Sequence, residues 1–311
     1  MNRISVIGAG MTGSTTAHWL AERELADIVL VDVVEGMPQG KSLDMAEAMP
    51  VIGKDVSIVG SNDYAATKGS DIIVITAGLP RKPGMSRDDL LTANAEIVGK
   101  AATETLKYSP DAIYIVLTNP LDTMAYLTMK MTGLPPQRVV GQAGILDSAR
   151  MRAFVAMETG VSVENIACYV LGGHGDEMVP LTRHSNIAGI PLRDYLPADK
   201  LAAIVGRTRK GGGEIVNLLK TGSAYYAPSA AVAQMAEAIL KNKHLIVPCA
   251  AYMQGEYGLN DMFFGVPVML GRAGIEKIVE YTLDEEEKAA FDKSAAGVRE
   301  VHDALRNLVK I

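Results

Sequence analysis

The sequence predicts an α/β fold in which a Rossmann-type doubly wound parallel sheet is followed by an α+β substrate domain. Two observations support the parallel sheet. Short Val/Ile-rich runs recur through the first half, and segments long enough for a crossover helix separate them. Runs that are apolar on both faces are what a parallel sheet covered by helices on both sides requires. They occupy residues 4–8, 27–32, 56–61, 71–78 and 112–120.

Helical patterns lie between these runs. They cover residues 11–23, 36–50 and 88–109. A strand, a crossover helix and a parallel strand form the repeating unit of a doubly wound domain. We expect this domain to span residues 1–144 and, because doubly wound domains commonly bind nucleotides, to bind a cofactor.

The second half has a different pattern and forms the predicted substrate domain, residues 145–311. Helical patterns alternate there with β-like runs typical of antiparallel hairpins. Helices are expected at 147–160, 200–220 and 229–241, and β-like runs at 165–173, 178–189, 244–253 and 265–271. The chain closes on an amphipathic helix, where Asp284 and Glu287 have capping-box spacing. Without a flexible linker the two halves should pack tightly, with ligands bound between them.

Composition excludes several classes of function. The 311 residues contain 30 Lys and Arg against 36 Asp and Glu, a net charge of −6, and no long block of like charge. Nucleic-acid and membrane-surface binding are therefore not expected. Cys168 and Cys249 each lie in an apolar run, which indicates small core residues in a reducing compartment rather than a disulfide. With no signal-peptide pattern and no apolar run of about 18 residues, we expect a cytoplasmic protein.

A glycine-rich motif follows the first run. Gly8, Gly10 and Gly13 form GxGxxG, in which the glycines permit a tight turn, close approach of a pyrophosphate and helix–strand packing. Three glycines can also be ordinary loop residues, but here a strand precedes them and a helix follows. Asp32 ends the next run, where a carboxylate accepts hydrogen bonds from a ribose diol and repels a 2′-phosphate. The motif therefore predicts NAD rather than NADP, although Asp32 alone could be a turn residue.

One of the five histidines stands out as a catalytic candidate. His174 follows an apolar run and lies among glycines in "LGGHGDEMV", so its ring can face a cavity. A metal site with Asp176 or Glu177 lacks further clustered ligands, so no metal is expected. The remaining histidines are better read as packed or surface residues: His18, His184, His244 and His302.

A carboxylate and a cation can accompany this histidine. A histidine that accepts an alcohol proton needs a partner that fixes its tautomer and stabilises the imidazolium. Asp147 and Arg150 lie three residues apart in "GILDSARMR", on one face of a predicted helix. Considered alone, the two could equally form a surface ion pair.

Taken together, these motifs resemble the lactate/malate dehydrogenase superfamily, and within it the lactate-dehydrogenase-like malate dehydrogenases of bacteria. The resemblance covers essentially the full length. Besides GxGxxG and Asp32, it rests on "TAGLPRKPGMSR", "VLTNPLD", "GILDSARMR", "GGHGDEMVPL" and "GSAYYAPSAA", which occur in the family's order. It implies reversible hydride transfer between (S)-malate or oxaloacetate and NAD, in a homodimer or homotetramer.

The resemblance also implies roles for individual residues. His174 would exchange the proton of the substrate hydroxyl, with Asp147 holding and stabilising its ring. Arg150 would bind the C1 carboxylate with a planar two-pronged contact. Asn119 would bind near the substrate and the nicotinamide, and Ser223 would line the substrate pocket. The implied cofactor-binding residues are Gly8, Gly10, Met11, Thr12, Gly13, Asp32, Thr76, Ala77, Gly78, Asn94, Thr118 and Asn119.

The segment "GLPRKPGMSR" would form a flap over the site in this family. Arg87 would polarise the substrate carbonyl as negative charge develops on its oxygen. Arg81 would pair with the second carboxylate of a dicarboxylate, because a desolvated guanidinium facing the methyl group of pyruvate would stay unpaired. Lys82 is expected to be a solvated charge without a catalytic role.

Two alternatives remain open from the sequence. A lactate or other 2-hydroxy acid dehydrogenase would have to tolerate Arg81. A non-catalytic NAD-binding sensor or scaffold would need none of the charged residues around His174.

Overall fold

The structure is a computed structural model that describes residues 2–80 and 87–309. Six parallel strands form the centre of its main sheet, in the order β3-β2-β1-β4-β5-β6. Their bounds are β1 (Arg3–Ile7), β2 (Asp27–Val31), β3 (Ile58–Ser61), β4 (Ile72–Ile75), β5 (Ile113–Val116) and β6 (Val139–Gly141). Each of the five predicted runs holds one strand, and the doubly wound fold class is confirmed.

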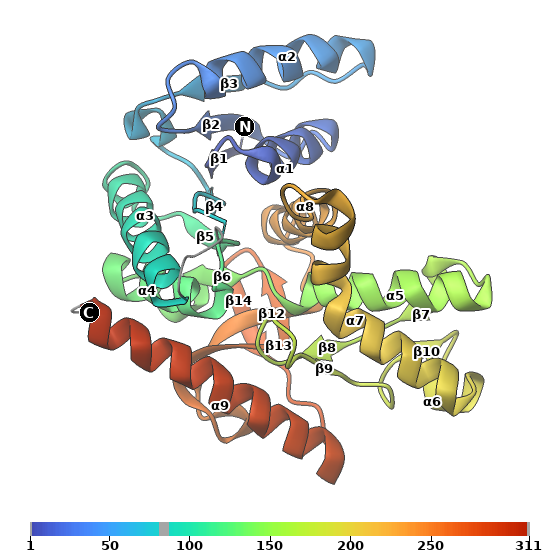
Figure 1. The fold of residues 1–311 in the computed structure, drawn as a ribbon. Coiled ribbons are helices and arrows are strands. Elements are labelled where there is room, and N and C mark those ends of the chain that lie inside the picture. The colour runs from blue at the N-terminus through green and yellow to red at the C-terminus, as the bar shows by residue number, and fades with distance from the viewer. Residues whose placement is uncertain (1, 81–86, 310–311) are drawn as a thin grey trace.

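Helices cover both faces of this sheet. Figure 1 shows α3 and α4 on one side of β4 and β5, and α1 and α8 on the other. Alternation along β4 explains why both faces are apolar: Ile72 and Val74 enter one core, and Ile73 and Ile75 enter the other. The helices are α1 (Met11–Glu22), α2 (Met37–Val51), α3 (Arg87–Tyr108), α4 (Leu121–Thr132), α5 (Gly144–Thr159), α6 (Leu192–Tyr195), α7 (Ala198–Leu219), α8 (Tyr226–Leu240) and α9 (Glu285–Leu308).

Strands of the second half extend the same sheet. The antiparallel strands β12 (Leu245–Gln254), β13 (Asn260–Gly271) and β14 (Gly274–Ile278) follow one another at its edge. The hairpin joins the parallel part through Ala250 of β12, which lies opposite Gly141 of β6. Both halves therefore contribute to one nine-stranded sheet.

The β-like runs at 165–173 and 178–189 are broken in the structure. They give only two-residue strands in two small sheets, separated by turns. These are β7 (Ile166–Ala167), β8 (Val170–Leu171), β9 (Val179–Pro180), β10 (Asn186–Ile187) and β11 (Ile190–Pro191). Several of their apolar residues fill a third core cluster together with side chains of α5 and α7, whereas Leu171, Val179 and Leu181 belong to the core that contains Ile72 and Val74. These segments resemble strands in sequence because buried segments of any conformation are rich in apolar residues.

Single-turn 3₁₀ helices complete the described elements: η1 (Tyr64–Thr67), η2 (Pro136–Arg138), η3 (Val163–Asn165) and η4 (Glu256–Gly258). Cys168 and Cys249 are buried and unpaired, as their apolar surroundings predict.

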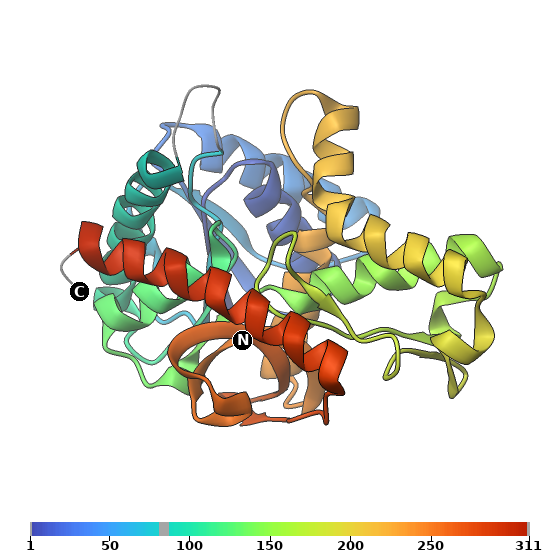
Figure 2. The ribbon, with the colours of Figure 1, turned by 60° about the horizontal axis from the view of Figure 1, so that its bottom comes forward.

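The last helix begins at the predicted capping box. The Asp284 carboxylate accepts the Glu287 N–H at 2.9 Å, and the Glu287 carboxylate accepts the Asp284 N–H at 3.0 Å. From there α9 crosses the molecule and packs against α3, α4 and β13 (Figure 2). The side chains of Ser294 and His302 on this helix are buried.

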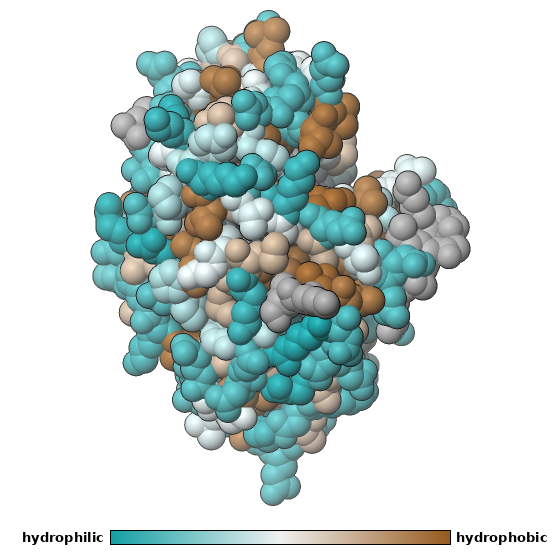
Figure 3. Space-filling view, turned by 90° about the vertical axis from the view of Figure 1, so that its left-hand side faces the viewer, coloured by the Kyte–Doolittle hydropathy of each residue, from teal (hydrophilic) through white to brown (hydrophobic). Residues whose placement is uncertain are grey.

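On the face that carries α3 and α4, hydrophilic side chains predominate and apolar ones occur in small groups (Figure 3). Among the described residues, no helix has both the length and the apolarity needed to cross a bilayer.

Candidate active site

The glycine motif forms the turn between β1 and α1. Gly8 has φ +106°, a conformation that favours glycine. A Cβ on Gly13 would lie 1.7 Å from the carbonyl oxygen of Gly8, so only glycine permits this close packing of helix on strand. A Cβ on Gly10 would meet no atom within 4 Å, so the backbone faces open space. These features match the predicted roles of the three glycines, and the helix amino terminus supplies N–H donors for a pyrophosphate.

Asp32 follows β2 beside this turn. One of its carboxylate oxygens accepts the N–H of Ala9 at 2.6 Å, and the other accepts the N–H of Val34 at 2.9 Å. Lys41 of α2 donates to the carbonyl of Ala9 at 2.6 Å and places a positive charge near the predicted phosphate site. Lys41 was not predicted as a site residue. Its position soon after Asp32, early in the next helix, could have indicated a positive charge near the phosphate site.

The other predicted cofactor residues lie after β4 and β5. The hydroxyl of Thr76 donates to the carbonyl of Ile7, and that of Thr118 donates to the carbonyl of Ala77 at 2.7 Å. A Cβ on Gly78 would lie 2.4 Å from the methyl group of Thr118, so the two segments touch. The carboxyl ends of β1, β4 and β5 therefore meet at one edge.

Asn94 of α3 ties this edge together. Its side-chain NH₂ donates to the carbonyl of Asn119 at 2.8 Å and to that of Leu79 at 3.2 Å, and its oxygen accepts the Leu79 N–H at 2.7 Å. Of the α1 residues, Thr12 accepts the hydroxyl of Ser229 through its carbonyl, whereas the side chain of Met11 is exposed. The edge lies where the strand order reverses between β1 and β4, the usual position of a dinucleotide in this fold. The residues present thus fit NAD.

The predicted acid and cation on α5 meet His174. Nδ1 of His174 lies 2.8 Å from one oxygen of Asp147, and the other oxygen accepts a hydrogen bond from Arg150 at 3.0 Å. The side chains of His174, Asp147 and Arg150 are 17%, 2% and 11% exposed. Such a buried ion pair differs from the surface pair that the spacing alone allowed.

Electrostatics favour a protonated His174. Burial lowers the pKa of the imidazole, but the charge and hydrogen bond of Asp147 raise it, and Asp122 adds to this effect. The nearby Arg150 acts in the opposite direction. The net result is that the pKa of His174 is raised above its ordinary value.

Glycine in α7 makes room for Arg150. A Cβ on Gly211 would lie 2.3 Å from Cδ of Arg150 and 2.7 Å from its Nε. Gly212 is more distant, because its Cβ would lie 3.9 Å from the guanidinium. The helix therefore approaches Arg150 at a position where a side chain would displace it. Sequence reasoning did not predict a role for Gly211, although "KGGGE" inside a helical pattern is an unusual run.

Three hydrogen bonds hold the backbone before His174. The N–H groups of Gly172, Gly173 and His174 donate to Gly265, Ser294 and Asp122, at 2.8, 3.0 and 3.0 Å. Asp122 and Ser294 were not predicted, although Asp122 ends the motif "VLTNPLD". The position of Asp122 at the start of an apolar helix could have indicated that its carboxylate is buried.

Some predicted residues are not brought into this group. Ser223 lies in the exposed segment between α7 and α8, and no described residue hydrogen-bonds its side chain. Arg81 and Lys82 lie outside the described residues. Arg87 begins α3, and its side chain is likewise outside the described part.

The other histidines have structural surroundings. His18 stacks edge-on near Trp19, and His302 is buried beneath α4. His184 stacks on Tyr281, and His244 pairs with Glu276 at the surface. Within residues 2–80 and 87–309, no three His, Cys, Asp or Glu side chains gather as a metal site would require.

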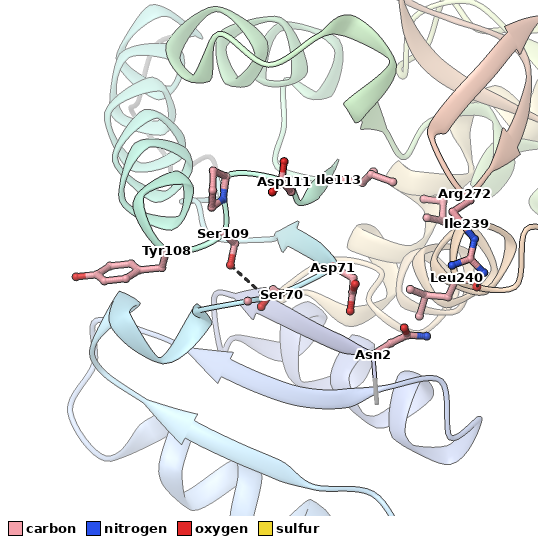
Figure 4. A pocket seen from close by; sticks show the side chains of 12 residues that line it. Asn2, Ser70, Asp71, Tyr108, Ser109, Asp111, Ile113, Ile239, Leu240 and Arg272 are labelled. Atoms are coloured by element: carbon pink, nitrogen blue, oxygen red, sulfur yellow. Dashed lines mark hydrogen bonds between the residues drawn. The ribbon is translucent and has the colours of Figure 1, made fainter.

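A hollow of about 300 Å³ lies at the opposite edge of the sheet, before β1, β4 and β5 (Figure 4). Its charged groups already have partners. Asp71 accepts the N–H of Arg3, Asp111 pairs with Arg138, and Arg272 donates to a carbonyl of α8. None of the described site residues lines this hollow.

Comparison with known proteins agrees with this geometry. The lactate/malate dehydrogenase NAD binding domain matches residues 2–141, and the lactate/malate dehydrogenase alpha/beta C-terminal domain matches residues 145–307. A malate dehydrogenase of Roseiflexus sp. (strain RS-1) is 59% identical, over 98% of each chain.

Solved structures include the apo malate dehydrogenase from Picrophilus torridus. It superposes with a TM-score of 0.96 and 47% identity, covering 99% of this chain and 98% of that one. The lactate dehydrogenase of Cryptosporidium parvum, complexed with lactic acid and nicotinamide adenine dinucleotide, gives 0.95 and 40%, with 98% of each chain covered. The chain belongs to the lactate/malate dehydrogenase family, and this confirms the predicted oxidoreductase class and the cofactor NAD.

Proposed function

We propose that the protein is an NAD-dependent malate dehydrogenase that interconverts (S)-malate and oxaloacetate. The observation that carries this proposal is the buried chain of contacts from His174 through Asp147 to Arg150. It combines a proton-exchanging group with a carboxylate-binding group. The relatives described above that are most similar in sequence bear the name malate dehydrogenase.

His174 exchanges the proton of the substrate hydroxyl through Nε2. Asp147 accepts the hydrogen bond from Nδ1, which fixes the tautomer and leaves Nε2 for the substrate. In malate oxidation His174 accepts the proton, and in oxaloacetate reduction it donates the proton to the new hydroxyl. Asp147 stabilises the imidazolium in both directions. When bound, NAD supplies the nicotinamide that accepts the hydride in oxidation and returns it in reduction.

Arg150 binds the C1 carboxylate of the substrate. Its hydrogen bond to Asp147 orients the guanidinium and leaves other N–H groups for a two-pronged contact. Asn119 follows β5, and its carbonyl is held by Asn94. In the proposed mechanism the side chain of Asn119 binds near the substrate and the nicotinamide.

The substrate class depends on the flap. Arg81 pairs with the C4 carboxylate of a dicarboxylate, and Arg87 polarises the carbonyl that is reduced. Both roles rest on the sequence and on the family, since these side chains lie outside the described residues. Ser223 lines the substrate pocket in this proposal, a role that rests on the family.

The test is oxidation of NADH measured at 340 nm with oxaloacetate and pyruvate side by side, repeated with NADPH. The proposal predicts rapid turnover of oxaloacetate with NADH, slow turnover of pyruvate, and weak use of NADPH because of Asp32. Preference for pyruvate would identify a lactate dehydrogenase. Binding of NADH without turnover of either substrate would favour the sensor alternative.

We further propose a homo-oligomer, either a dimer or a tetramer. Leu43 and Val51 of α2 are 62% and 85% exposed, and Ile52 is exposed beside them. Exposed apolar side chains of this kind are typical of surfaces that a second subunit covers. Sedimentation equilibrium would give the subunit number, and a monomer at micromolar concentration would contradict the proposal. We also propose a cytoplasmic location and a boundary between the two domains at residues 144/145.

A further inference from the structure

The backbone that carries His174 is held from three sides. Gly172 donates to β13 through the carbonyl of Gly265, and Gly173 donates to the hydroxyl of Ser294 on α9. The N–H of His174 itself donates to a carboxylate oxygen of Asp122 at 3.0 Å. Two of these acceptors are neutral, and Asp122 alone can bring a charge.

Asp122 lies at a buried position, where a carboxylate lowers the stability of the folded protein. It is the second residue of α4, only 6% exposed, and its oxygen Oδ1 is buried without a hydrogen-bond partner among the described residues. Leaving a buried polar atom unpaired lowers the stability of the folded protein. The position at a helix amino terminus offsets part of this cost. Satisfying one N–H needs no charge, because the neighbouring Ser294 does it with a hydroxyl.

We propose that Asp122 is a positioning residue for His174, which fixes its backbone through one oxygen and stabilises the protonated ring through its negative charge. His174 then lies between two carboxylates, with Asp147 bonded to the ring and Asp122 bonded to the backbone. Among the described residues, Arg150 on α5 also acts on the charge of the ring, and on α9 the facing residue Ser294 is neutral. This inference deepens the proposed function and rests on it.

The electrostatics support this arrangement. Burial raises the pKa of Asp122 to about 6, against the lowering effect of the His174 N–H and ring. Asp122 is therefore ionised at neutral pH, and its charge raises the pKa of His174. Because its own pKa is close to neutral, Asp122 loses its charge on mild acidification, when His174 is already protonated.

The position also links two parts of the site. Asp122 comes three residues after Asn119, whose carbonyl Asn94 holds. A shift of α4 would therefore move Asn119 and the backbone of His174 together. The helix thus keeps the proposed proton-exchanging group and the proposed nicotinamide contact in a fixed relation to each other.

The experiment compares three variants. Asp122→Asn keeps the shape and one acceptor oxygen but removes the charge, and Asp122→Ala removes both. Ser294→Ala is the matched control, because it removes the adjacent backbone contact without changing any charge. NADH binding by fluorescence titration checks that each variant is folded.

Two readouts separate this inference from the proposed function. The first is the titration of His174 observed by NMR of protein labelled with ¹³C-histidine and assigned with His174→Asn, which needs no turnover. The second is the pH dependence of kcat/KM for oxaloacetate. We expect both midpoints to fall by roughly half a pH unit or more in Asp122→Asn and in Asp122→Ala, and to stay unchanged in Ser294→Ala. In Asp122→Ala, kcat should fall further, by about tenfold.

An NMR midpoint that is the same in Asp122→Asn and in the wild type would overturn the proposal. Equal shifts in Ser294→Ala and Asp122→Asn would also overturn it, because they would reduce Asp122 to a backbone contact. If the wild type failed to reduce oxaloacetate, the proposed function would fail, and the NMR titration would still decide the effect of Asp122 on His174.

Discussion

Asp147 contacts His174 with one carboxylate oxygen and Arg150 with the other, at 2.8 and 3.0 Å. One buried anion thus orients both the proposed proton-exchanging group and the proposed carboxylate-binding group. The burial of Asp147, at 2% side-chain exposure, keeps both contacts away from competing water.

Replacing Asp147 by Asn should therefore impair both functions. We expect kcat to fall by about a hundredfold or more, because the amide can hold the wrong tautomer and cannot stabilise the imidazolium. Oxaloacetate reduction needs the protonated ring, so its kcat/KM falls as the pH rises through the raised pKa of His174. In Asp147→Asn this fall should begin at a lower pH. The exposed Asp176→Asn is the control, and the same pH profile in Asp147→Asn and in the wild type would contradict the role of Asp147.

Enlarging Gly211 should displace Arg150. A Cβ there would lie 2.3 Å from Cδ of Arg150. For Gly211→Ala we expect kcat/KM for oxaloacetate to fall roughly ten- to a hundredfold, mainly through KM, with the affinity for NADH retained. Gly213→Ala is the matched control in the same helix, because its Cβ would meet no atom within 4 Å. Equal effects of the two variants would point to helix stability rather than to Arg150.

Arg81→Gln should alter substrate selectivity. Removing the cation removes the partner of the C4 carboxylate, and it also removes the unpaired charge that disfavours pyruvate. Activity with oxaloacetate should fall and activity with pyruvate should rise, each measured by NADH oxidation. Lys82→Gln is the control for a change of flap charge. Unchanged selectivity in Arg81→Gln would show that another residue selects the dicarboxylate.

His302 should make stability depend on pH in the acid range. Its Nδ1 donates to the carbonyl of Val298 at 2.9 Å, and its Nε2 accepts the N–H of Phe263 at 3.3 Å, so the buried ring is neutral. Burial lowers its pKa to about 4. The unfolded chain binds a proton below about pH 6.5, where the folded protein does not, so stability is lost as the pH falls from about 6.5 to 4.

At pH 5 this effect amounts to about 2 kcal/mol. His302→Gln should therefore reduce the difference in urea midpoint between pH 7.5 and pH 5, because a neutral amide does not titrate. Asp122 titrates in both proteins, so its contribution cancels from the comparison. The exposed His244→Gln should behave like the wild type. A pH dependence that His302→Gln leaves intact would assign the acid sensitivity to other groups.

Local signals in the sequence predicted the parts that depend on few neighbours. The strands from β1 to β5 could be predicted, because each lies in a Val/Ile-rich run, and β1, β2, β4 and β5 are almost entirely buried. The capping box at Asp284 and the turn at Gly8 were equally local. By contrast, the β-like runs at 165–173 and 178–189 are apolar in the way that buried strands are, and only the structure shows that they form two-residue strands between turns.

The fold class, the cofactor motif and the types of side chain that the chemistry requires could be predicted from the sequence, because they depend on periodicity and on spacing along the chain. Tertiary structure alone decided which of these side chains meet. Asp147 and His174 are 27 residues apart, and Asp122 is 52 residues from His174. Contacts at such separations arise from the packing of α4, α5 and α9 around one loop, and spacing along the chain does not encode that packing.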